Sequence, residues 1–249
     1  MSAANLAKPR GFAASINSDI NKPHVIKGCK PEVFADIYLE QTNMVIWQRE
    51  LSNTLKQAVA AFLKSNASFQ LAMTVTPQSA KESLKESLKE SLRESLKESV
   101  HESAGQIIGD SNPGELSENI AELVDMFCYL FDLKRAGLRL TVLDRAMCPK
   151  FHVDHVPCRL ITTFQGIATE WLPHEAVNRE KLGAGSQGQP DAKSGLYQSQ
   201  RDIQCLSPGD VALLKGEGWQ GNENAGLVHR SPAVTGGERR LLLTLDFSE

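Results

Sequence analysis

Hydrophobic positions in the first half of the chain recur with the period of a helix. From residue 31 to about residue 63 they fall at spacings of four, four and three, which places one set on a single helix face: Leu51, Leu55, Val59 and Phe62. The same template fits residues 116–131, after which Gly137 offers a helix stop. We therefore predict a helical region over residues 29–137. It follows a small, polar, aperiodic stretch at residues 1–28, which we expect to form a loosely ordered arm.

A tetrapeptide repeat, Lys-Glu-Ser-Leu with small variations, fills residues 81–100. Each four-residue step on a helix advances by about 400°, so the leucines drift by about 40° per repeat and leave any single face. Like charges four residues apart, as at Lys81 and Lys85, weaken such a helix further. A binding helix or coiled coil is one interpretation. We favour the other, a low-complexity insertion that forms a solvated helix.

After Gly137 the hydrophobic positions take on the period of strands. Short apolar or alternating segments lie between clusters of Pro, Gly and Asn, at residues 138–142, 159–164, 203–206, 211–214, 226–229 and 240–247. Residues 178–199, rich in Gly, Ser and Gln, are typical of a long loop. Several short strands with such turns indicate a sandwich or jelly roll. We predict an α+β fold, in which the helical N-terminal half packs on a C-terminal double-stranded β-helix, a cupin-like jelly-roll metal-binding domain at residues 138–249.

Composition narrows the class of protein. The 249 residues are 41% hydrophobic and carry a net charge of −3 without a basic stripe, which argues against nucleic-acid binding. No run approaches the roughly 18 apolar residues of a membrane span, and the N-terminus lacks the apolar core of a secretory signal. Five cysteines, an odd number, indicate reduced thiols. We expect a cytoplasmic protein that does not bind membranes, with its substrate and oligomeric state open.

The densest candidate chemistry lies between Cys148 and Cys158, where the chain holds two His and one Asp as well as these two thiols. If the segment is extended, alternate side chains share a face. His152 and Asp154 then point together, with Cys158 on the same side, whereas His155 points the other way. An imidazole and a carboxylate two residues apart on a strand can close on one metal ion.

A distant histidine can complete this ligand set. His229 ends a late strand, and together with His152 and Asp154 it would form a site of two histidines and one carboxylate that leaves coordination positions open. Arg240 opens the final strand, and an arginine facing such a site suits bidentate binding of a carboxylate. Two alternatives stay open: a hydrogen-bonded structural set without metal, and a tetrahedral zinc site that includes Cys158.

This arrangement resembles the double-stranded β-helix oxygenases that use Fe(II) and 2-oxoglutarate. The resemblance implies that His152, Asp154 and His229 bind the metal, with Fe(II) preferred and Zn(II) as the alternative. It also implies that Arg240 holds the distal carboxylate of 2-oxoglutarate, because Thr244 lies four residues after it. The cupin His-x-His motif is missing from the chain.

A closer resemblance covers most of the chain. Five segments resemble a bacterial family, domain of unknown function 1826: residues 148–159, 169–172, 209–221, 226–232 and 240–247. The repeat at residues 81–100 departs from that pattern, and the family supplies no established reaction. We therefore predict a metal-binding protein that is an Fe(II)/2-oxoglutarate-type oxygenase acting on an unknown substrate. The alternative is a non-catalytic zinc- or iron-binding module linked to metal homeostasis.

Overall fold

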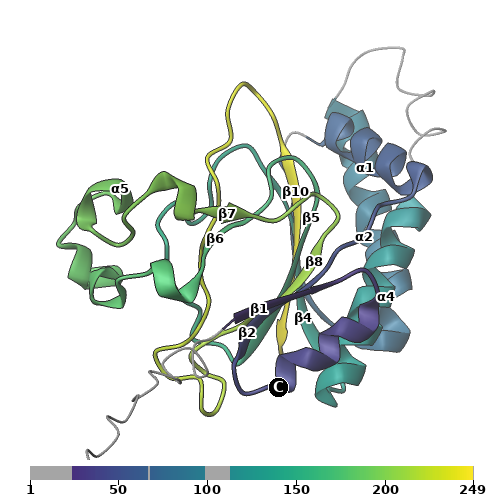
Figure 1. Cartoon of the computed structure of the whole chain (residues 1–249). Helices are drawn as coiled ribbons and strands as arrows, with labels where there is room; N and C mark the ends of the chain where they lie inside the picture. Colours follow the sequence, from purple (N-terminus) through teal and green to yellow (C-terminus); the bar gives the residue numbers. More distant parts are fainter. Residues whose placement is uncertain (1–23, 67, 99–112, 249) are drawn as a thin grey trace, which may run out of the picture.

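The computed structural model describes residues 24–66, 68–98 and 113–248, which form two sheets and a layer of helices (Figure 1). The main helices are α1 (Asn53–Ser65), α2 (Pro77–Glu98), α4 (Pro113–Phe131) and the short α5 (Asp191–Ser194), and a 3-10 helix, η1, spans Pro31–Tyr38. The strands are β1 (His24–Gly28), β2 (Thr42–Trp47), β3 (Gln70–Val75), β4 (Ala136–Leu143), β5 (Cys158–Gln165), β6 (Glu170–Leu172), β7 (Gln204–Cys205), β8 (Val211–Lys215), β9 (Val228–Arg230) and β10 (Arg240–Phe247).

The larger sheet combines strands from both ends of the chain. Its seven strands lie in the order β1-β2-β8-β5-β10-β4-β3, while the smaller sheet has the order β7-β6-β9. All neighbours in the larger sheet are antiparallel except β1 and β2. The fold is therefore mixed α/β with one large sheet, and its N-terminal half is not the separate helical region that we predicted for residues 29–137.

Two N-terminal predictions are wrong because both segments pair as strands in the large sheet. Residues 24–28, expected in the loose arm, form β1, and residues 42–47, expected in a helix, form β2. Met44, Val45 and Ile46 are buried on successive positions, so both faces of β2 are covered, one by the helices and one by the smaller sheet. Pairing with β8 across the sheet overrides the local helical pattern. The rest of the arm, residues 1–23, lies outside the described residues.

The helices α1, α2 and α4 cover one face of the large sheet (Figure 1). Side chains of α4 on one face, among them Ile120, Leu123 and Phe127, are buried against β-strand residues such as Leu243 and Leu245. The amphipathic prediction for residues 116–131 is confirmed, but its stop is not at Gly137, which lies inside β4. The helix ends at Phe131, and Asp132 follows in the left-handed conformation with φ 51°.

The repeat helix belongs to the core, so our expectation of a solvated insertion is wrong. Leu84 and Leu88 are fully buried and Leu92 is 8% exposed, in the same core cluster as α4. From Leu84 to Leu92 the stripe drifts by only about 80°, which fits the apolar sector of roughly 100° that an amphipathic helix buries. An ion pair of 2.7 Å between Lys81 and Glu118 joins α2 to α4. Residues 99 and 100 of the repeat lie outside the described residues.

The smaller sheet packs over the opposite face of the large sheet. A second core cluster lies between them and includes Ile161, Trp171 and Leu242. The predicted loop at residues 178–199 contains α5 and short 3-10 turns, and Leu196 and Tyr197 pack with Phe151 beside the smaller sheet. The predicted strands after Gly137 are confirmed, with ends that differ by a few residues.

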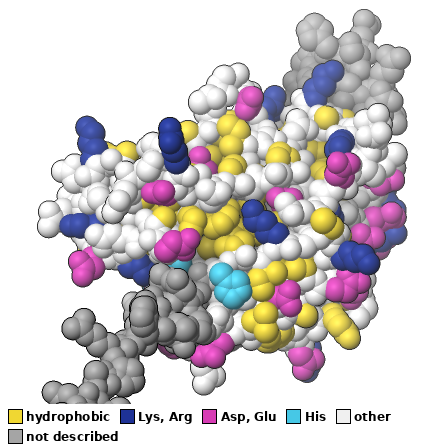
Figure 2. Space-filling model, in the orientation of Figure 1, with side chains coloured by type: hydrophobic (Ala, Val, Ile, Leu, Met, Phe, Trp, Pro, Cys, Tyr) yellow, Lys and Arg dark blue, Asp and Glu magenta, His cyan; other side chains and the backbone are white. Residues whose placement is uncertain are grey.

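Figure 2 shows acidic and basic side chains interspersed on one face of the molecule, without a continuous patch of one charge on that face. None of the helices in the described parts of the chain combines the length and the apolar character that crossing a membrane requires.

Candidate metal centre

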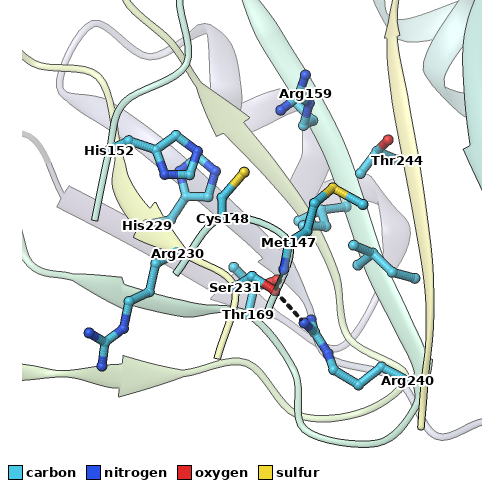
Figure 3. Close-up of a pocket in the computed structure, with 12 residues that line it drawn as sticks. Met147, Cys148, His152, Arg159, Thr169, His229, Arg230, Ser231, Arg240 and Thr244 are labelled. Atoms are coloured by element: carbon cyan, nitrogen blue, oxygen red, sulfur yellow. Dashed lines mark hydrogen bonds between the residues drawn. The ribbon is translucent and has the colours of Figure 1, made fainter. Parts of the chain in front are cut away.

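His152 and His229 are brought together by a single β-bridge. His152 forms an isolated antiparallel bridge with His229 of β9, and each backbone N–H donates to the other carbonyl over 3.0 Å. The two imidazole rings lie next to each other (Figure 3). Their centroids are 4.6 Å apart. The backbone therefore fixes this pair of side chains on the same side of the bridge, although the residues are far apart in the sequence.

Asp154 closes the group. Its Oδ1 lies 3.9 Å from Nε2 of His152, and its Oδ2 lies 3.6 Å from Nε2 of His229. One ligand atom from each of the three residues falls within 4.8 Å of the others. Among the described residues no other group of three or more His, Cys, Asp or Glu side chains meets in this way. These three residues can therefore hold a divalent metal ion.

The imidazole nitrogens are oriented as metal ligation requires. Nδ1 of His152 lies 3.0 Å from the carbonyl oxygen of Lys150, and Nδ1 of His229 lies 3.3 Å from that of Leu227. A carbonyl oxygen only accepts, so each Nδ1 carries the proton and donates it. Each Nε2 faces Asp154 and, in the neutral ring, keeps a lone pair. Such contacts to the nitrogen that does not bind are how proteins orient metal-ligating histidines.

Burial keeps His229 in the form that binds metal. Its side chain is nearly enclosed, and burial lowers its pKa to about 4, although the negative charge of Asp154 opposes the shift. At pH 7 the imidazole is neutral. The neutral ring is the form that ligates a metal, so no proton has to be displaced from it.

The structure does not bring Cys158 to this group, so the tetrahedral zinc site that includes this thiol is wrong. Cys158 is buried in the core on the helical side of β5. The chain bends at residues 155–157, so alternation cannot be carried from Asp154 to Cys158. His155 is exposed and turns away from the group, with its Nδ1 3.6 Å from Glu217.

Arg159 also contacts the site, although its role was not predicted from the sequence. From β5 its Nη1 donates to Oδ2 of Asp154 over 2.9 Å. Its Nε and Nη2 donate to the two carboxylate oxygens of Asp246 on β10, over 2.7 and 3.1 Å. Alternation along β5 places Arg159 and Ile161 on one face, but the pairing with Asp246 depends on the register between two strands. No spacing in the sequence reveals that register.

Arg240 lies fully buried in the wall of the same pocket. Its Nη1 donates to Oγ of Ser231 over 2.7 Å, which Figure 3 marks, and its Nη2 is 3.5 Å from Oγ1 of Thr163. Within the described parts of the chain, its Nε has no hydrogen-bond partner and no carboxylate forms an ion pair with it. Burial lowers its pKa to about 10, so the guanidinium is charged at pH 7. The neighbouring Arg239 points to the helical side and donates to carbonyls at the end of α1.

The pocket between these groups is small, and the flexible side chain of Met147 lies in its exposed part. Its cavity of about 70 Å³ is lined by residues that include Met147, Cys148, His152, His229, Arg240 and Thr244. Water occupies roughly 30 Å³ per molecule in the liquid, so the cavity holds only a few waters. Met147 at the mouth is 50% exposed. An unbranched side chain there can rotate away to admit a larger ligand.

Glu170 forms an ion pair beside the pocket. Arg230, which follows His229, donates from Nε to Oε2 of Glu170 over 2.6 Å and lies over the ring of Phe151. Its Nη1 is 3.5 Å from Asp191. This network anchors β9 to β6 and to the segment that carries His152. Glu170 thus has a structural role here.

The fold and the site define a mixed α/β protein with a candidate metal centre of two histidines and one aspartate. The chain belongs to the family of proteins of unknown function DUF1826, whose pattern matches residues 28–246. No curated protein matches the chain.

The chain is also similar in overall trace to several solved structures. A dioxygenase for auxin oxidation in rice has 11% identity and a TM-score of 0.41, over 90% of this chain and 82% of that one. A prolyl-4-hydroxylase of Pseudomonas putida has 11% identity and a TM-score of 0.39, over 88% and 98%. HygX of Streptomyces hygroscopicus, with iron bound, has 10% identity and a TM-score of 0.40, over 87% and 85%. At this level of similarity the function has to be inferred from the side chains of the site.

Proposed function

We propose that the protein is an Fe(II)- and 2-oxoglutarate-dependent oxygenase. His152, Asp154 and His229 bind the metal, and Arg240 binds the distal carboxylate of 2-oxoglutarate. One observation carries the proposal: a fully buried arginine, without a carboxylate partner among the described residues, lines the same pocket as the two histidines. A buried charge without a partner is costly unless a ligand supplies one.

The donor set fits a divalent metal. Two neutral imidazoles and one carboxylate are the ligands typical of non-haem Fe(II) in oxygenases, and three protein ligands leave open positions. Zn(II) is the alternative metal for the same atoms. When bound, the iron supplies the activation of O₂: 2-oxoglutarate becomes succinate and CO₂, one oxygen atom enters succinate and the other enters the substrate.

The pocket walls fit the cosubstrate's chemistry. The guanidinium of Arg240 is planar and can grip a carboxylate with two parallel hydrogen bonds, and Ser231 at 2.7 Å fixes its direction. Ile161 and Leu242 line the same cavity and limit the access of water, which strengthens this contact. Because the cavity is about 70 Å³, we expect Met147 to move when a five-carbon dicarboxylate enters.

The two sheets support a double-stranded β-helix. The large sheet contributes Ile161 of β5 and Leu242 of β10 to the shared apolar cluster between the sheets, and the smaller sheet contributes Trp171 of β6. Leu227, which directly precedes β9, belongs to the same cluster. The metal candidates lie at one end of this cluster, where β9 meets the segment around His152. We infer that these facing strands form the jelly roll that holds the site.

Metal analysis of the full chain, purified without chelator, tests the ligand assignment. We expect about one metal per chain in the wild type and its loss in His152→Ala and His229→Ala. His155→Ala is the matched control, because this histidine lies on the same segment but is exposed and turned away. Equal metal content in all four proteins would refute the site.

Succinate release from 2-oxoglutarate by the iron-loaded protein tests the reaction. Arg240→Ala should abolish it, whereas Arg239→Ala should keep it, because Arg239 points to the end of α1. Stoichiometric zinc without succinate release under any loading would instead identify a non-catalytic binding module, the alternative function for the same three ligands.

A further inference from the structure

The carboxylate of Asp154 is held from the side of its Oδ2 atom. Nη1 of Arg159 donates to this oxygen over 2.9 Å, and the same oxygen lies 3.6 Å from Nε2 of His229. Oδ1 has no such donor among the described residues and lies 3.9 Å from Nε2 of His152. The Asp154 side chain is 13% exposed, so solvent competes little for Oδ2. The two oxygens of one candidate ligand therefore have different surroundings.

Arg159 is itself fixed in place. It lies directly opposite Asp246 in the register between β5 and β10, and its Nε and Nη2 form a fork on that carboxylate, over 2.7 and 3.1 Å. A guanidinium is planar and rigid, so a fork on Asp246 also sets the direction of Nη1. The strands of the sheet thereby determine the position of the atom that contacts Asp154.

We infer that Arg159 is a positioning residue that restricts Asp154 to a single metal-ligating oxygen. The inference rests on the proposed function. A carboxylate that bound through both oxygens would occupy one coordination position more. Since Oδ2 accepts from Arg159, Oδ1 would be the oxygen that binds the metal, and three positions would stay free for the two donor atoms of 2-oxoglutarate and for oxygen.

The contact to Asp154 is more than cross-strand stabilisation. An ion pair between β5 and β10 needs only Asp246, yet the third nitrogen of Arg159 reaches the metal candidate. Arg230 provides a comparison within the same pocket: it is equally enclosed, with 21% of its side chain exposed, and it pairs with Glu170 over 2.6 Å. Arg230 does not form an ion pair with Asp154 in the described structure.

Cobalt(II) titration of the full chain, followed by visible absorption, tests the inference. Co(II) stands in for iron, and its absorption intensity reports the number of ligands around it. In Arg159→Gln we expect the Kd for Co(II) to rise by about 10- to 100-fold, the range for lost support of a metal ligand. We also expect the position and intensity of the bands to change, because Asp154 is free to bind through both oxygens and would replace a water ligand.

Further variants separate positioning from stability. Arg159→Lys keeps the charge but cannot span both carboxylates, so it should share the altered spectrum. Asp246→Asn keeps Arg159 and loosens its fork, so it should change the spectrum in the same direction, and it provides the test if Arg159→Gln does not fold. Arg239→Gln is the control, because Arg239 donates to carbonyls at the end of α1, and it should keep the wild-type spectrum.

The outcomes distinguish this inference from the proposed function. A wild type that binds no Co(II) refutes the metal site and the inference with it. If the wild type binds Co(II) and the Arg159 variants show its affinity and spectrum while only their melting temperature falls, Arg159 is structural and the inference alone fails. Full rescue by Arg159→Lys, or equal changes in Arg239→Gln, would also overturn it.

Discussion

A β-carbon on Gly166 would lie 2.8 Å from Cγ of Arg240. It would also come within 2.7 Å of the carbonyl oxygen of Arg239, and Gly166 has a φ of 91°, which other residues rarely adopt. Gly166 directly follows β5, at the point where the register between β5 and β10 shifts. The side chain of Arg240 reaches the pocket by passing over a residue that has no side chain of its own.

Gly166→Ala should therefore displace Arg240 and weaken the binding of 2-oxoglutarate. We expect a higher KM for 2-oxoglutarate with unchanged metal content, and a loss of about 1–3 kcal/mol in the free energy of unfolding from the backbone strain. Gly188→Ala is the control, because Gly188 has a φ of 77° but a β-carbon added there would meet nothing within 4 Å. Equal KM values in the two variants would show that the collision with Arg240 has no effect.

Removal of the metal should destabilise the protein. The bridge between His152 and His229 joins two distant segments, so an ion on both side chains stabilises only the folded chain. At a free metal concentration of 100 times its Kd, the free energy of unfolding should rise by about 2.7 kcal/mol. Denaturant unfolding with added Zn(II) or with chelator measures this difference. The difference should vanish in His229→Ala and persist in His155→Ala; a wild type that is indifferent to chelator would contradict the prediction.

Gly216 allows the strand β8 to approach the backbone of Asp154. Its Cβ would overlap the carbonyl oxygens of Val156 and Asp154, the latter at 2.6 Å, while Glu217 N–H donates to that same Asp154 oxygen over 2.9 Å. Gly216→Ala should shift Asp154 and lower the metal affinity by about 10-fold or more. Gly137→Ala, whose Cβ makes only an ordinary contact at 3.7 Å, should keep the affinity. Metal titration of both variants measures the two affinities. Equal affinities would show that the loop accommodates the added β-carbon without shifting Asp154.

Alternation within one strand could be predicted from the sequence, and much of the site depends on it. Along β10 the predicted alternation is observed: Arg240, Leu242 and Thr244 line the pocket, whereas Leu241 and Leu243 pack on the helical side. Successive side chains of a strand point to opposite faces of the sheet, so the face of each residue follows from the sequence of that strand alone.

What depends on pairing between distant strands could not be predicted. The contact of Arg159 with Asp246 requires the register of β5 against β10. The place of β2 in the sheet depends on its pairing with β8, which follows more than 160 residues later in the chain. Cys158 was misplaced because the chain bends before it. For Arg159 and β2 the deciding contact is long-range and leaves no periodic pattern in the local sequence.

The repeat helix should contribute as a core helix does. Leu88 is fully buried between α2 and α4, and truncation of a buried leucine costs about 2–5 kcal/mol through lost burial and the cavity it leaves. Leu88→Ala should lower the free energy of unfolding by that amount in urea. Lys89→Ala, the exposed neighbour, should change it by less than about 0.5 kcal/mol. A change of less than about 0.5 kcal/mol in Leu88→Ala would instead support a solvated insertion.

The Cys158 thiol should make stability fall with rising pH. Burial raises its pKa above the usual range, although the nearby charge of Lys215 opposes the shift. Because the unfolded chain loses this proton first, near pH 8.5, the folded state is disfavoured above that pH by about 1.4 kcal/mol per pH unit.

Cys158→Ala removes the thiol and leaves a small cavity, so it is less stable at pH 7. Urea unfolding between pH 7 and 10 should show the difference between the two proteins shrinking above about pH 8.5. Parallel curves over the whole range would mean that Cys158 ionises in the folded protein as readily as in the unfolded chain.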